Sequence, residues 1–174
     1  MKIKKFCYTF LIIFFGLILL LFFCVGRVYF NQNRIPGFQD YGLDFRSHSG
    51  AEAIEIMGTP FLEEEVSEEE RMYYTYFKPV FGKDAEVILK VNELTDYFFE
   101  VDVTWEFDNE QEAQKWFAKV KREVRKNSFV PFVSQEKTID ATDWRCYLGY
   151  LSCKVRIYET KVNYRAVNIE SWMS

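Results

Sequence analysis

A stretch of alternating side chains at residues 97–108 constrains the fold of this chain more than any other segment. Successive side chains of a β-strand point to opposite faces, so a period of two predicts a strand with one face on a core and the other in water. This pattern is typical of an antiparallel sheet that is covered on one side only. The expected core-facing residues are Tyr97, Phe99, Val101, Val103, Trp105 and Phe107, and the water-facing residues include Phe98, Glu100 and Asp102.

Five more segments are expected to be strands because apolar and aromatic residues dominate them between turn residues. Gly149-Tyr150 predicts a two-residue hairpin turn between two of these segments. The expected strands are residues 72–78, 85–91, 144–148, 151–158 and 162–170.

Two helices are also expected. Ser49 is a good N-cap, and Glu52 three residues later completes a capping box, which predicts a short helix. A longer helix is expected to begin after Asp108 or Asn109 and to run to about residue 126. Its apolar residues recur at helical spacing and predict the face that packs on the sheet. They are Ala113, Trp116, Phe117, Val120 and Val124.

Together these elements predict an α+β fold with a predominantly antiparallel sheet and helices packed on one face. Their order is helix, three strands, helix, three strands, which predicts two tandem units. No residue-level repeat accompanies this order.

An apolar run covers residues 6–25 and follows Lys2, Lys4 and Lys5. At about 1.5 Å per helical residue its length is roughly 30 Å, the thickness of a bilayer core. The run predicts an N-terminal transmembrane helix, and the lysines predict a cytoplasmic N-terminus. The expected localisation is therefore a single-pass protein of the cell membrane with an extracytoplasmic C-terminal domain.

The chain is divided accordingly into a cytoplasmic stub (1–5), a transmembrane anchor (6–28), a tether (29–48) and an extracytoplasmic α+β domain (49–174). A cleaved signal peptide is the alternative. Its apolar region would be about 7–15 residues long, which is shorter than this run. Cys24-Val25-Gly26 has the small-x-small pattern of a cleavage site, so cleavage stays open.

Charge is distributed unevenly along the chain. Residues 31–112 contain 6 basic and 20 acidic residues, a net charge of −14, whereas residues 113–174 contain 12 basic and 6 acidic residues, a net charge of +6. The two parts are of opposite sign and could attract each other. The overall acidity argues against a nucleic-acid partner.

Residues 49–107 resemble a known family in part. A short helix ends at Gly58-Thr59-Pro60, the aromatic strand Tyr74-Thr75-Tyr76-Phe77-Lys78 follows, and the segment Val87-Ile88-Leu89-Lys90-Val91 comes after a turn. This order resembles the SmpA/OmlA family of small outer-membrane assembly lipoproteins and their relatives with the β-lactamase-inhibitor-protein fold. The resemblance implies a non-catalytic module that binds other proteins. The chain departs from the family because it has no lipobox and continues well beyond the resembling segment.

Cys146 and Cys153 are the candidate disulfide. A turn at residues 149–150 would place the two cysteines opposite each other on paired strands, within bridging distance. The alternative is a pair of half-buried thiols.

Catalytic and metal chemistry is not predicted. The single histidine, His48, lacks an identifiable partner and more readily marks a helix start. Glu100-Val-Asp102 differs from the aspartate-nucleophile motif of phosphohydrolases because its first residue is Glu. The acidic run at residues 63–70 lacks the spacing and the glycine of a calcium loop. No catalytic, cofactor-binding or metal-binding residue is assigned, and no cofactor is expected.

The expected function is a non-enzymatic binding or scaffold module for an envelope protein. The alternative is an inhibitor or immunity-type protein that blocks an enzyme or a toxin at the membrane. A carboxylate-based hydrolase is the third hypothesis, and it requires Glu100 or Asp102 to line a concave pocket with a raised pKa. The candidate contact residues are Tyr73, Tyr76, Phe98, Glu100 and Asp102.

Overall fold

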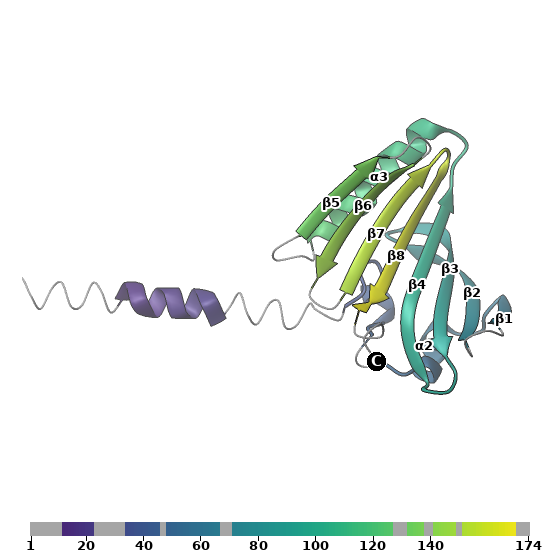
Figure 1. The fold of residues 1–174 in the computed structure, drawn as a ribbon, viewed down its shortest axis with the longest axis horizontal. Coiled ribbons are helices and arrows are strands. Elements are labelled where there is room, and N and C mark those ends of the chain that lie inside the picture. The colour runs from purple at the N-terminus through teal and green to yellow at the C-terminus, as the bar shows by residue number, and fades with distance from the viewer. Residues whose placement is uncertain are drawn as a thin grey trace, which may run out of the picture.

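The fold is known from a computed structural model, and its main feature is one eight-stranded antiparallel sheet (Figure 1). The strand order is β1-β2-β3-β4-β8-β7-β6-β5. The structure describes residues 12–22, 34–45, 48–66, 71–126, 132–137, 141–148 and 151–169.

Two helix-plus-meander units make up the sheet. The first unit consists of α2 (Gly50–Met57), β1 (Leu62–Val66), β2 (Arg71–Val80), β3 (Lys83–Asn92) and β4 (Tyr97–Glu106). The second unit consists of α3 (Glu110–Lys126), β5 (Phe132–Lys137), β6 (Thr142–Leu148), β7 (Leu151–Tyr158) and β8 (Lys161–Asn168).

The last strands of the two units, β4 and β8, pair antiparallel at the centre of the sheet, and this junction is called the seam below. The expected units of three strands are corrected to four, because β1 and β5 add a strand at each edge. β1 overlaps the acidic run at residues 63–70, and neither β1 nor β5 was among the expected strands. The expected turn at residues 149–150 lies outside the described residues.

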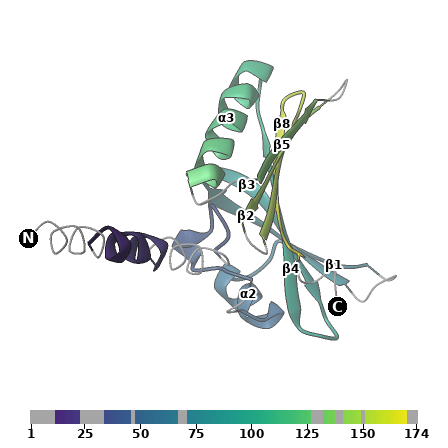
Figure 2. The same ribbon diagram turned by 60° about the vertical axis from the view of Figure 1, so that its left-hand side comes forward.

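The helices lie on one side of the sheet only (Figure 2). α2 contacts β3 and β4, and α3 contacts β6, β7 and β8. The other side, called the open face below, is not covered by any helix in the described part of the chain. The helices therefore divide the sheet into a core face and an open face.

Local signals explain where the helices begin. The expected capping box of α2 is confirmed, since Ser49 accepts from the backbone N–H of Glu52 and Glu52 accepts from that of Ser49. Asp96 from the β3–β4 turn also accepts from the N–H of Ala51 and ties α2 to the sheet. Asn109 caps α3 by accepting from the N–H of Glu112.

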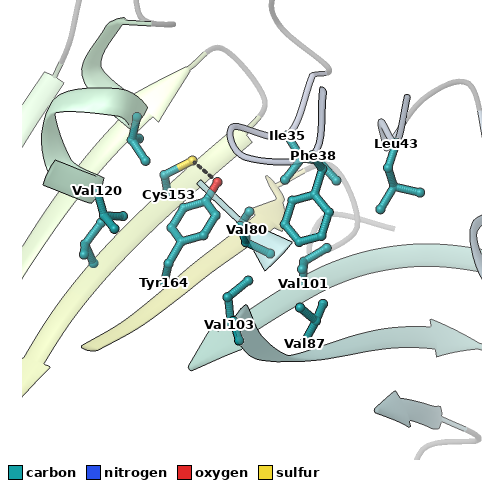
Figure 3. Close-up of a cluster of buried hydrophobic side chains, with 14 of the residues drawn as sticks. Ile35, Phe38, Leu43, Val80, Val87, Val101, Val103, Val120, Cys153 and Tyr164 are labelled. Atoms are coloured by element: carbon teal, nitrogen blue, oxygen red, sulfur yellow. Dashed lines mark hydrogen bonds between the residues drawn. The ribbon is translucent and has the colours of Figure 1, made fainter. Parts of the chain in front are cut away.

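Residues 34–45 complete the core, although residues 29–48 were expected to be a tether. Ile35, Phe38, Leu43 and Phe45 are buried. Figure 3 shows Ile35 and Phe38 near Val80 of β2 and Val101 of β4. Residues Gln39–Tyr41 form the short 3₁₀ helix η1. Burial of these apolar side chains removes them from water and fixes the segment on the first unit.

A β-bulge in β4 corrects the expected alternation. Lys90 pairs with Glu100, but the next residue, Val91, pairs with Phe98, so Phe99 is the extra residue. The bulge turns Phe98 into the core, where its ring lies 4.7 Å from that of Phe45. An extra residue reverses the alternation on one side of the bulge, and the sequence pattern alone does not reveal it.

The expected membrane anchor is also corrected. The helix near the N-terminus is described over residues 12–22, and among the described residues no helix is long and apolar enough to cross a membrane. A span requires about 20 helical residues. The predicted transmembrane helix over residues 6–28, the single-pass membrane localisation and the extracytoplasmic assignment that depended on it are therefore contradicted.

Candidate functional site

An ion-pair cluster lies on the open face where β3, β4 and β8 meet. It consists of Lys90, Glu100, Asp102 and Arg165. Cross-strand pairing positions the four residues, since Lys90 lies opposite Glu100 and Asp102 lies opposite Arg165. Adjacent strands thus present alternating charges on the same face.

Glu100 is the centre of the cluster, with a side chain that is only 2% exposed. Lys90 Nζ donates to Oε1 and Arg165 Nη2 donates to Oε2, each at 2.5 Å. Lys90 Nζ also lies 2.8 Å from Asp102 Oδ2, and Arg165 Nε lies 3.9 Å from Asp102 Oδ1. Two cations therefore bracket two carboxylates.

Burial and hydrogen bonding act in opposite directions on these carboxylates. Burial raises the pKa of Glu100, but the hydrogen bonds from Arg165 and Lys90 outweigh it and hold this pKa below its usual value. Burial raises the pKa of Asp102, and so does the neighbouring charge of Glu100. Lys90 lowers this pKa by its hydrogen bond and its charge, but by less, so the pKa of Asp102 is above its usual value. Glu100 is therefore the more firmly ionised of the two.

A second ion-pair cluster lies on β6 and β7. Asp143 is buried and accepts from Arg156 Nε at 2.7 Å and Nη2 at 3.3 Å. Lys154 Nζ lies 2.8 Å from Asp143 Oδ2. Burial would raise the pKa of Asp143, but the hydrogen bonds from Arg156 and Lys154 lower it. One carboxylate thus holds two cations, which leaves this part of the open face basic.

Opposite charges from the two parts of the chain meet at the seam. Glu100 and Arg165 pair across it, and Lys161 Nζ lies 2.5 Å from Glu106 Oε1. The expected attraction between the acidic and basic parts of the sequence is confirmed at these contacts.

The expected contact residues are divided between the two faces. Tyr73 lies on the open face, with Lys90 Nζ 5.1 Å from its ring centre. Glu100 and Asp102 lie there too, in the cluster just described. Tyr76 and Phe98 are buried on the core face and are no longer candidate contacts. Lys90 and Arg165 were not among the contact residues expected from the sequence. Each is a charged residue inside an expected strand, and this could have indicated an ion pair with a neighbouring strand.

Cys146 and Cys153 lie opposite each other, as expected, but on the core face. Both thiols are buried, and no disulfide joins them. Cys153 Sγ lies 3.6 Å from the hydroxyl of Tyr164 (Figure 3). Burial raises the pKa of Cys153 to about 12, which keeps this thiol protonated and a poor nucleophile at neutral pH.

His48 has a local structural role, since its Nδ1 lies 3.3 Å from the backbone nitrogen of Asp44. No group of three or more His, Cys, Asp or Glu side chains that could hold a metal ion is found in the described part of the chain. The two ion-pair clusters of the open face are therefore the candidate functional site.

Comparison of the chain with protein-family models, with curated proteins and with solved structures finds no match. The resemblance to the SmpA/OmlA family therefore still depends on the sequence motifs alone.

Proposed function

We propose that this chain is a non-enzymatic protein-binding module that binds its partner through the open face. The observation that carries this proposal is the pair of ion-pair clusters on a sheet face that no described helix covers. A face of this kind offers charges in fixed positions, which favours recognition of a complementary protein surface.

Fixed side chains also lower the entropy that is lost on binding. Lys90, Glu100 and Asp102 are held by one another, and their side chains are 15%, 2% and 18% exposed. Long side chains that are already ordered lose little further rotamer freedom in a complex. The resemblance to non-catalytic binding proteins agrees with this interpretation.

The inhibitor or immunity-type function is the second candidate, because an ordered charged face also suits tight binding to one enzyme or toxin. It predicts a one-to-one complex in which the activity of the partner is lost. An assay of the purified partner with and without this chain separates an inhibitor from a scaffold.

Capture of crosslinked partners from cells, with the full-length tagged protein, tests the proposal. The variant Glu86→Arg changes an exposed residue of the open face, and Glu55→Arg makes the same change on the exposed side of α2. We expect Glu86→Arg to lose the partners that the unchanged protein and Glu55→Arg retain. Equal capture by all three proteins would contradict binding through the open face.

A further inference from the structure

We propose that the open face binds a second copy of this chain, in a dimer whose twofold axis runs along the seam between β4 and β8. The inference rests on the proposed function, because it names the protein that the open face binds. A twofold dimer requires a surface that is complementary to itself.

Acidic and basic side chains are segregated on the open face by the seam. Cross-strand register places each residue on a face, since residues that pair share it. On the first unit the charged residues include Glu64, Glu86, Glu100, Asp102 and Glu106, with Arg71 and Lys90. On the second unit they include Arg145, Lys154, Arg156, Lys161 and Arg165, with Asp143.

The register also fixes which residues would meet. Glu86, Thr104, Asn163 and Arg156 form one row across β3, β4, β8 and β7. Glu86 and Arg156 therefore lie one strand beyond the seam on opposite sides. An axis parallel to the strands, midway between two stacked sheets, exchanges the two sides without moving a residue along its strand. It places Arg156 of the second copy over Glu86, and Glu86 of the second copy over Arg156.

The two central residues of the neighbouring row are also complementary under the same axis. Ile88, Asp102, Arg165 and Lys154 lie in register across the same four strands. The axis places Arg165 of the second copy over Asp102. An axis perpendicular to the strands in the same plane would instead place acid over acid, so the charges select the first axis.

The two residues that would meet are accessible. Glu86 is exposed. The side chain of Arg156 is 48% exposed, and Asp143 engages its Nε and Nη2. Nη1 is the part of the guanidinium that a second carboxylate can reach.

The open face is also large enough for a specific dimer. Eight strands about 4.8 Å apart, with central strands of eight to ten residues at about 3.3 Å each, give roughly 1,000 Å² per copy. This exceeds the roughly 800 Å² per partner of a standard interface.

Sedimentation velocity of the purified full chain with charge-swap variants tests the dimer. Glu86→Arg and Arg156→Glu would each place like charges opposite each other at two symmetry-related contacts. We expect each variant alone to be monomeric at concentrations where the unchanged protein is a dimer. We expect an equimolar mixture of the two to dimerise, and the double variant Glu86→Arg/Arg156→Glu to regain the dimer. Raising salt from 0.05 to 0.5 M should weaken the unchanged dimer at least tenfold.

Two controls keep the result interpretable. Glu55→Arg and Lys115→Glu make equivalent charge changes on the helices and should leave the dimer intact. If Arg156→Glu fails to fold beside Asp143, the variant Asp143→Asn/Arg156→Glu removes the opposing carboxylate and replaces it in the scheme.

A monomeric unchanged protein, or single variants that remain dimeric, would overturn the second copy as the occupant. The capture experiment then tests the proposed function independently, because it detects partners other than a second copy of the chain. Loss of foreign partners in Glu86→Arg, with a monomeric unchanged protein, keeps the binding module and rejects only the dimer.

Discussion

At the residue scale, Glu100 and Asp102 were expected to face water from β4, and in the structure they belong to an ion-pair cluster. The sequence predicted that Glu100 and Asp102 share the solvent side of a strand, and both do lie opposite the core. It did not predict that Glu100 would be buried, because burial depends on Lys90 and Arg165 from neighbouring strands. A charge is buried in a protein only when partners satisfy it.

Replacing Glu100 with Gln should destabilise the fold by about 3 kcal/mol, because it removes the buried carboxylate that pairs with both Lys90 and Arg165 and leaves Asp102 as the one carboxylate of the cluster. Urea unfolding at pH 7 measures this change. Glu64→Gln on β1 is the matched control, since Glu64 is exposed. A loss in Glu100→Gln no larger than in Glu64→Gln would show that the cluster does not stabilise the fold.

Asp143→Asn should lower the free energy of unfolding by about 2 kcal/mol at pH 7, through the loss of hydrogen bonds to a charged group. The folded-state pKa of Asp143 lies below its ordinary value of 3.8, so its contribution is fully present above pH 3.8 and is lost as the pH falls through the folded pKa. The difference between the two proteins should therefore be constant from pH 7 to pH 5 and shrink below pH 4. A difference that grows on acidification would contradict this assignment.

At the element scale, six of the eight strands and the helices α2 and α3 fall close to their predicted residues. Strands with alternating or continuous apolar residues carry their own signal. β1 has the sequence LEEEV, and every residue from Leu62 to Glu65 is exposed, so its strand conformation depends on pairing with β2 and not on its own composition. β5 was missed for a related reason, since its hydrogen bonds are made with β6.

The segment at residues 34–45 differs most from its prediction, because Pro36, Gly37 and Gly42 are typical of a linker. Its apolar residues are few and irregularly spaced, so they show no period. Their burial depends on contacts with distant residues of the first unit, such as that of Phe45 with Phe98.

Phe38→Ala should therefore destabilise the fold by about 3–5 kcal/mol, as expected for removal of a buried aromatic ring. Asp40→Ala, at an exposed position of η1, should change stability by less than about 0.5 kcal/mol. Thermal and urea unfolding of the two variants checks this expectation. Equal stability of both variants would show that residues 34–45 do not stabilise the fold and are a tether.

At the scale of the whole molecule, the helices cover one face and the charges organise the other. The sequence predicted helices on one side of a sheet, but strand order is a property of long-range pairing that no local pattern contains. Pairing of β4 with β8 joins an acidic unit to a basic one and produces the charge segregation of the open face.

Site-specific photocrosslinking tests whether the open face is the binding surface. A photoreactive amino acid is placed at position 86 on β3 or at position 55 on α2 of the full-length protein, and adducts formed in cells are compared. We expect protein adducts, of a second copy or of another protein, at position 86 and none above background at position 55. Adducts at position 55 with none at position 86 would show that the protein binds through its helical side.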